Sequence, residues 1–138
     1  MTGQPLNVLI VDDCEIVRNL LASLLPSPIF RPWFAENGRQ ALAWLELQEF
    51  DIMSTDYNMP TMDGLELVAM VRGNSRHDRM PILMISSEQN RAIHDQAIAY
   101  RNVHWLPKHA AMLSYQQALI ASIDSAASER PNRNCAAA

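Results

Sequence analysis

The stretch STDYNMP, residues 54 to 60, places a carboxylate directly after a short apolar segment and before a loop that contains proline. A carboxylate oxygen can attack phosphorus and form an aspartyl phosphate. Asp56 is therefore the first candidate for covalent chemistry in this chain, provided that its surroundings leave it within reach of a phosphoryl donor.

Two further acids, Asp12 and Asp13, follow the first apolar segment in VLIVDD. Carboxylates with reference pKa values near ~4 repel one another when they are gathered, and a divalent cation relieves this repulsion. Mg²⁺ prefers oxygen ligands and keeps several waters. If the fold brings Asp12 and Asp13 to Asp56, the three acids predict a magnesium site. The alternative is that Asp12 and Asp13 only cap the following helix, a frequent role of aspartate.

A hydroxyl and an amine follow two later apolar segments. Ser86 stands in MISSE, and Lys108 follows VHWLP. A metal ion and an ammonium group both stabilise the charge on the oxygens of a transferring phosphoryl group. Taken singly, Ser86 could bond nearby backbone and Lys108 could be a solvated surface charge. Together with the acids, they indicate phosphoryl transfer to Asp56.

Short apolar segments alternate with segments of helical period along the chain. The predicted strands cover residues 6–11, 30–35, 51–55, 82–86 and 103–106. Apolar residues at helical spacing predict a helix after each strand, the last of them over 110–125. Asp63 and Glu66 are typical of a capping box at a helix start. The alternation predicts an α/β domain with a parallel sheet.

Two prolines bear on the strand order. Pro32 lies in the second segment and Pro107 at the end of the fifth, and proline, which lacks a backbone donor, is confined to sheet edges. This agrees with the doubly wound, flavodoxin-like order 2-1-3-4-5, which is adopted from known folds and has those strands at its edges. In that order ligands bind beyond the carboxyl ends of the first and third strands, where Asp12, Asp13 and Asp56 would meet.

Composition excludes several classes of protein. The chain has 138 residues, 49% of them hydrophobic, and a net charge of −4, which suits one globular domain. No basic stripe indicates a nucleic-acid surface. No apolar stretch reaches membrane-spanning length and no leader pattern is present, so we expect a soluble, cytoplasmic protein without membrane insertion.

The end of the sequence is small and polar. We expect a domain over residues 1–125 and a disordered tail over 126–138. Cys135 begins a formal lipidation box, CAAA, which we interpret as part of this tail. Cys14 and Cys135 lie too far apart in the sequence to indicate a disulfide framework.

Taken together, these motifs resemble the receiver domain of two-component response regulators, in particular the stand-alone CheY-like type. The resemblance covers residues 6 to about 125 and rests on VDD, DYNMPTMDGLEL, ISSE and Lys108. It implies a (βα)5 fold with a five-stranded parallel sheet. It also implies a protein phosphorylated on Asp56 by a histidine kinase or phosphotransfer protein, which signals to an unidentified protein partner by a conformational change and is not an enzyme in its own right.

The resemblance assigns roles to individual residues. The implied ligands of Mg²⁺ are Asp12, Asp13, Asp56 and the backbone carbonyl of Asn58. Ser86 and Lys108 would contact the phosphoryl group. Trp105, three residues before Lys108, occupies the aromatic switch position and would move together with Ser86. Asn58 and Glu88, two residues after Asp56 and Ser86, would tune the lifetime of the phosphoryl group.

The chain departs from the family pattern around the fifth strand. His109 follows Lys108 where the family usually has proline, and Trp105 replaces the more usual Tyr or Phe. Ser87 stands where alanine is usual, and residues 101–102, Arg and Asn, replace a small turn that contains glycine. We therefore expect retained phosphorylation with an unusual partner face.

Two other functions remain open. A pseudo-receiver would keep the fold as a binding module without phosphorylation. A haloacid-dehalogenase-like phosphatase also uses a strand-end Asp, Mg²⁺, a hydroxyl and a lysine, but it carries an acid/base Asp two residues after the nucleophile. Here that position is Asn58.

Overall fold

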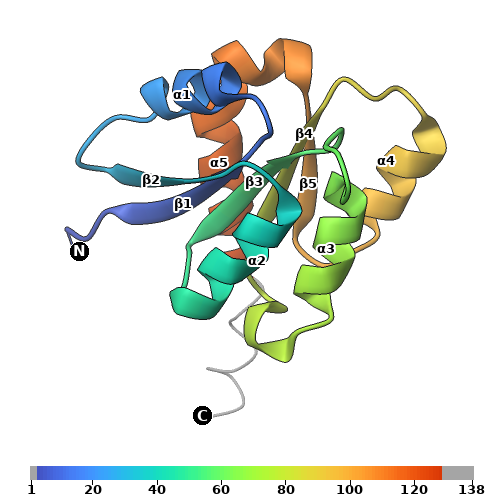
Figure 1. The fold of residues 1–138 in the computed structure, drawn as a ribbon. Coiled ribbons are helices and arrows are strands. Elements are labelled where there is room, and N and C mark those ends of the chain that lie inside the picture. Colours follow the sequence, from blue (N-terminus) through green and yellow to red (C-terminus); the bar gives the residue numbers. More distant parts are fainter. Residues whose placement is uncertain (1–2, 129–138) are drawn as a thin grey trace.

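A five-stranded parallel sheet forms the centre of the computed structural model, which describes residues 3–128 (Figure 1). The strands are β1 (Leu6–Val11), β2 (Phe30–Ala35), β3 (Ile52–Asp56), β4 (Ile82–Ser86) and β5 (Val103–Pro107). Their order is β2-β1-β3-β4-β5, and every neighbouring pair is parallel. This confirms the predicted order, with Pro32 and Pro107 on the edge strands.

Helices cover both faces of the sheet. They are α1 (Glu15–Ser23), α2 (Gly38–Leu47), α3 (Gly64–Arg72), α4 (Arg91–Ile98) and α5 (Ala111–Ser128), with short 3-10 turns η1 (Ser75–His77) and η2 (Lys108–Ala110). Helices α1 and α5 lie on one face, and α2, α3 and α4 lie on the other (Figure 1). None of the helices within residues 3–128 has the length and apolarity needed to cross a bilayer.

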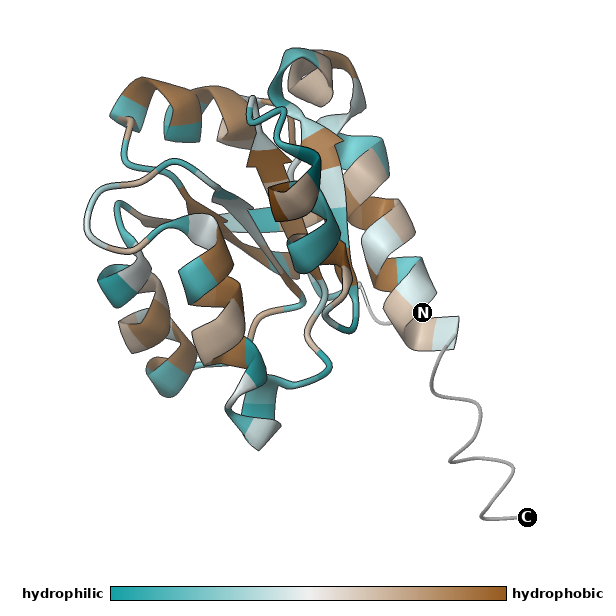
Figure 2. Cartoon of the chain, turned by 90° about the vertical axis from the view of Figure 1, so that its right-hand side faces the viewer, coloured by the Kyte–Doolittle hydropathy of each residue, from teal (hydrophilic) through white to brown (hydrophobic). Residues whose placement is uncertain are grey.

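The core has two halves because the central strands β1, β3 and β4 are buried on both sides. Val8 and Ile10 of β1 pack toward α1 and α5, while Leu9 and Val11 pack toward α2 and α3. Burial on both sides explains why these central strands are mostly apolar and do not alternate with polar residues. Hydrophobic residues accordingly concentrate along the strands and on the helices next to them (Figure 2).

Three elements, β3, β5 and α5, have bounds that differ from those expected. β3 runs from Ile52 to Asp56, one residue later than predicted, because the Asp51 carboxylate accepts the Asn7 backbone N–H at 2.7 Å and lies ahead of the strand. β5 includes Pro107. α5 continues to Ser128, three residues into the segment predicted as a tail, where Ala126 is buried. The lipidation box lies outside the described residues.

The turn before β5 explains one departure from the family pattern. Asn102 adopts φ +57°, a left-handed conformation that favours glycine and that asparagine tolerates better than most residues. Its side-chain amide donates to the Arg79 carbonyl at 3.3 Å. Asparagine can thus provide the backbone geometry for which the family uses a turn containing glycine.

Candidate functional site

The carboxyl ends of β1 and β3 bring three acids together. Val11 pairs with Thr55 in the sheet, so the residues that follow them, Asp12 and Asp56, lie side by side. One carboxylate oxygen each from Asp12, Asp13 and Asp56 lies within 4.8 Å of the other two. Asp12 and Asp56 are buried, whereas Asp13 is exposed. This is the cluster that the strand order predicted.

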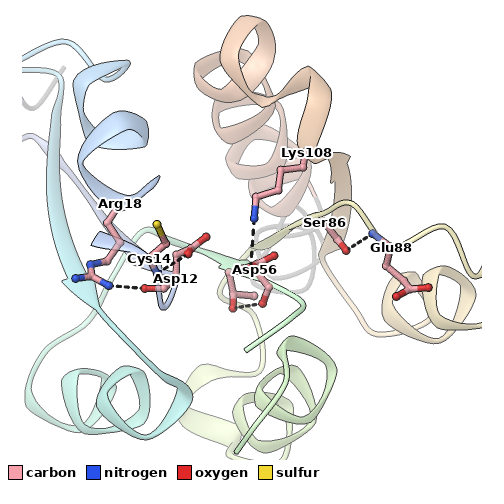
Figure 3. Close-up of polar contacts among 8 residues, drawn as sticks. Asp12, Cys14, Arg18, Asp56, Ser86, Glu88 and Lys108 are labelled. Carbon is pink, nitrogen blue, oxygen red and sulfur yellow. Dashed lines mark hydrogen bonds and ion pairs between the residues drawn. The ribbon is translucent and has the colours of Figure 1, made fainter. Parts of the chain in front are cut away.

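Burial is the main influence on Asp12. It raises the pKa of the Asp12 carboxyl, and the nearby Asp56 charge raises it further, against the hydrogen bond from Cys14. In that bond the Cys14 backbone N–H donates to Asp12 Oδ1 at 2.9 Å (Figure 3). The N-cap of α1 is Cys14, which makes no side-chain capping bond. Asp12 therefore does not cap α1 in the usual way, because its bond goes to the residue before the helix.

Asp56 combines burial with a nearby cation. Burial raises its pKa, and the charge of Lys108 together with the backbone N–H groups of Tyr57 and Asn58 opposes that rise. Lys108 Nζ lies 3.5 Å from Asp56 Oδ2 (Figure 3), and the lysine side chain is 37% exposed whereas Asp56 is 5% exposed. The site therefore holds a buried carboxylate with a partly hydrated ammonium beside it.

The acid cluster fits a magnesium ion. It offers hard carboxylate oxygens around one point, and the pKa values of Asp12 and Asp56 are raised because their negative charge is buried with only partial compensation. A divalent cation would remove that cost. Asn58 lies in the following loop, and the predicted role of its carbonyl as a ligand stays a prediction.

We predict that protons and magnesium compete at this cluster. Because the folded pKa values of Asp12 and Asp56 are raised above 3.8, both carboxyls take up protons at a higher pH than ordinary aspartates. Mg²⁺ affinity should therefore fall as the pH drops through these raised values, which calorimetric titration near neutrality and in mildly acidic buffer would measure. Equal affinities in the two buffers would contradict the expectation.

The same shift has a consequence for stability without metal. A carboxyl with a raised folded pKa favours the folded state while it is protonated, so this contribution is present below 3.8 and lost as the pH rises through the folded pKa. Added Mg²⁺ should consequently raise the urea midpoint more near neutral pH than in acid.

Ser86 is the last residue of β4 and is buried. Its Oγ accepts the Glu88 backbone N–H at 2.8 Å (Figure 3). The hydroxyl thus bonds nearby backbone, as the sequence allowed for a Ser86 without a functional role. A hydroxyl that accepts one bond can still donate its own proton, so this contact does not prevent Ser86 from donating to an incoming phosphoryl oxygen.

The loop after Asp56 is held close to the strand by Gly64. The Gly64 N–H donates to the Tyr57 carbonyl at 2.8 Å, and a Cβ on Gly64 would come within 2.5 Å of the Asp56 carbonyl oxygen and 2.7 Å of Met84 Sδ. The predicted capping box is confirmed, with Asp63 and Glu66 each accepting the other's backbone N–H.

We predict that Gly64→Ala destabilises the protein by roughly 1–3 kcal/mol, the usual cost of forcing extra volume into a filled site. The clash is with backbone, so the loop that positions Asp56 must move, and Mg²⁺ affinity should fall as well. Gly73→Ala is the matched control, because the nearest atom to a Cβ on Gly73 would be the Ala69 carbonyl oxygen, one helical turn earlier, at 3.3 Å. Urea unfolding of both variants would test this, and equal losses would contradict it.

Two features of the site were missed from the sequence. Arg18 Nη1 donates to the Asp12 backbone carbonyl at 2.6 Å (Figure 3), which ties α1 to the end of β1. The only signal in the sequence was a basic residue six positions after the acid. In addition, a cavity of about 560 Å³ opens beside Asp13, between Glu36 to Arg39 and Pro60 to Met62. No pattern within either segment indicated this cavity.

Comparison with known proteins gives consistent results. The sequence pattern of the response regulator receiver domain matches residues 8–120. The chemotaxis protein CheY of Pseudomonas aeruginosa is 37% identical over 87 residues, which are 62% of this chain and 70% of that protein.

Solved structures are similar as well. Chemotaxis response regulator CheY4 of Vibrio cholerae superposes with a TM-score of 0.73 at 31% identity, over 83% of this chain and 98% of that one. A signal receiver domain from an HD domain-containing protein of Pseudomonas fluorescens gives a TM-score of 0.81 at 24% identity over 94% of each chain, a likeness of fold alone. The segment matched by the receiver pattern contains Asp12, Asp13, Asp56, Ser86 and Lys108.

Proposed function

This chain belongs to the response regulator receiver domain family, and from that premise we propose that it is a CheY-like response regulator receiver domain that accepts a phosphoryl group on Asp56. The donor is a phosphohistidine on a histidine kinase or phosphotransfer protein. One observation carries the proposal: Asp56 lies within 4.8 Å of the carboxylates of Asp12 and Asp13 and 3.5 Å from the Lys108 ammonium.

The chemistry follows from these neighbours. A carboxylate oxygen of Asp56 forms the new P–O bond while the P–N bond of the donor breaks, and the electron pair of that bond stays with the imidazole nitrogen. Lys108 offsets the charge on the phosphoryl oxygens, and Ser86 donates its hydroxyl proton to one of them. When bound by Asp12, Asp13, Asp56 and the Asn58 carbonyl, Mg²⁺ supplies positive charge for the same oxygens.

Phosphorylation then changes the surface around β5. A phosphoryl group adds roughly −1.5 to −2 charge and new acceptor oxygens, which draw Ser86 inward and let Trp105 move. Changing the ratio of switched to resting molecules from 1:99 to 99:1 takes about 5.5 kcal/mol of differential stabilisation. The output is a changed face of α4, β5 and α5 for a partner protein. Asn58 and Glu88 border the site and set how long the phosphoryl group lasts.

Incubation with acetyl phosphate and Mg²⁺, followed by intact mass measurement, tests the proposal. We expect the mass of one added phosphoryl group, dependent on Mg²⁺ and lost again on standing. A protein that stays unmodified would favour the pseudo-receiver. Continuing turnover of a generic phosphate ester would instead favour a phosphatase.

A further inference from the structure

An aromatic contact joins β5 to α4. The ring centroids of Trp105 and His94 are 5.1 Å apart and their planes are inclined at 67°, an edge-to-face arrangement that aromatic rings favour. Both residues are half-buried. The indole at the switch position is therefore held against a side chain of α4.

His94 is itself fixed by its own helix. Its backbone N–H donates to the Asn90 carbonyl at 3.2 Å, and its Nδ1 lies 3.2 Å from Asp95 Oδ1. Arg91 Nε lies 3.7 Å from the same carboxylate oxygen, but both side chains of that pair are largely exposed, so it contributes little. The position of the imidazole thus follows the position of the first turn of α4.

Local hydrogen bonds connect that first turn to Ser86. The Glu88 N–H donates to Ser86 Oγ at 2.8 Å (Figure 3), the Asn90 N–H donates to Glu88 Oε2 at 3.0 Å, and the Ala92 N–H donates to Asn90 Oδ1 at 2.8 Å. Each bond joins residues two positions apart, so the position of the Ser86 hydroxyl is coupled to the position of the first turn of α4. A change in the bonding of Ser86 is transmitted to the helix that carries His94.

We propose that His94 is a positioning residue that holds Trp105 in its resting orientation, so that the indole leaves only when α4 moves. The proposal rests on the proposed function and adds the regulation of the same site. A cavity of about 350 Å³ lies at this contact, lined by Glu88, Gln89, Arg91, His94 and Trp105. It provides space for the two side chains to separate.

Removing the ring of His94 should therefore favour the switched state. Beryllofluoride with Mg²⁺ serves as the probe, because it mimics a phosphoryl group on Asp56. Since a ligand that selects the switched state binds more tightly when the resting state is weakened, His94→Ala should bind it roughly three- to tenfold more tightly than wild type. His94→Phe keeps a ring at this position and should restore wild-type affinity.

The experiment uses the 138-residue chain labelled with 5-fluorotryptophan and followed by ¹⁹F NMR, with the Trp105 signal assigned from a Trp105→Phe variant. In the resting protein, His94→Ala should shift the Trp105 signal and leave those of Trp33 and Trp44 in place. Gln96→Ala, at an exposed position of the same helix that does not line this cavity, is the control and should change neither the signal nor the affinity. His94→Leu, which has no ring but fills more of this half-buried position than alanine, gives the same test if His94→Ala does not fold.

The outcomes separate the two proposals. If wild type takes up no beryllofluoride, the proposed function fails and this inference fails with it. If wild type binds the probe but the variants without a ring bind it equally well, with the Trp105 signal unmoved, only the inference is overturned. Failure of His94→Phe to restore the wild-type affinity would also overturn it.

Discussion

Asp56→Asn is expected to take up no phosphoryl group from acetyl phosphate or from a phosphohistidine donor, whereas wild type gains the mass of one phosphoryl group. An amide lacks the anionic oxygen that attacks phosphorus, and it removes one of the three carboxylates of the acid cluster. Intact mass after incubation measures both proteins. Asp124→Asn, at an exposed position of α5, is the matched control and should label like wild type.

The same substitution is expected to raise the stability of the metal-free protein near neutral pH. Burial raises the pKa of Asp56, so the ionised carboxyl opposes folding there, and a neutral amide of the same shape avoids that cost. Lys108 is 37% exposed and remains solvated without its partner. A variant that is less stable than wild type would contradict the predicted cost of burying the ionised Asp56 carboxyl. A variant that still gains a phosphoryl group would contradict the role of Asp56 as the phosphoacceptor.

Arg72→Ala is expected to cost about 2–4 kcal/mol of unfolding free energy, because the guanidinium satisfies carbonyl groups from separate loops. Nη1 donates to the His77 carbonyl at 2.9 Å, Nη2 donates to the Met80 carbonyl at 2.6 Å, and Nε donates to the Arg101 carbonyl at 2.8 Å. These bonds join the end of α3 to the segments that precede β4 and β5. Burial lowers the pKa of Arg72 to about 10, so the side chain stays charged at neutral pH.

Urea unfolding would measure this loss. Arg76→Ala is the control, since Arg76 is exposed on the neighbouring turn η1, and a surface change of this kind stays within roughly ±0.5 kcal/mol. Arg72→Lys should recover little, because an ammonium cannot reproduce the planar donors of a guanidinium. Since these loops lie at the opposite ends of the strands from Asp56, folded Arg72→Ala protein should still accept a phosphoryl group. Equal midpoints for Arg72→Ala and Arg76→Ala would contradict the role of Arg72.

The sequence alone was sufficient to predict the strands and helices and the meeting of Asp12, Asp13 and Asp56 at one edge of the sheet. The central strands β1, β3 and β4 are buried on both faces and are therefore mostly apolar, so they could be found in the one-dimensional pattern. Pro32 and Pro107 indicated the edge strands because a missing backbone donor is a local property of the chain. Parallel strands end at the same edge of a sheet, so acids that directly follow apolar runs were predicted to meet. The strand order came from known folds and could not be read from the residues.

Only the tertiary structure decided which distant groups touch and how strongly burial acts on them. The pKa values of Asp12 and Asp56 rise because of the protein packed around them, and no single segment encodes that environment. Arg72 reaches a carbonyl 29 residues away, and Trp105 meets His94 across two elements. α5 extends to Ser128 where a polar composition predicted a tail, because Ala126 is buried in the folded protein. In each case the deciding interaction joins residues from different elements, so it exists only once those elements are packed together.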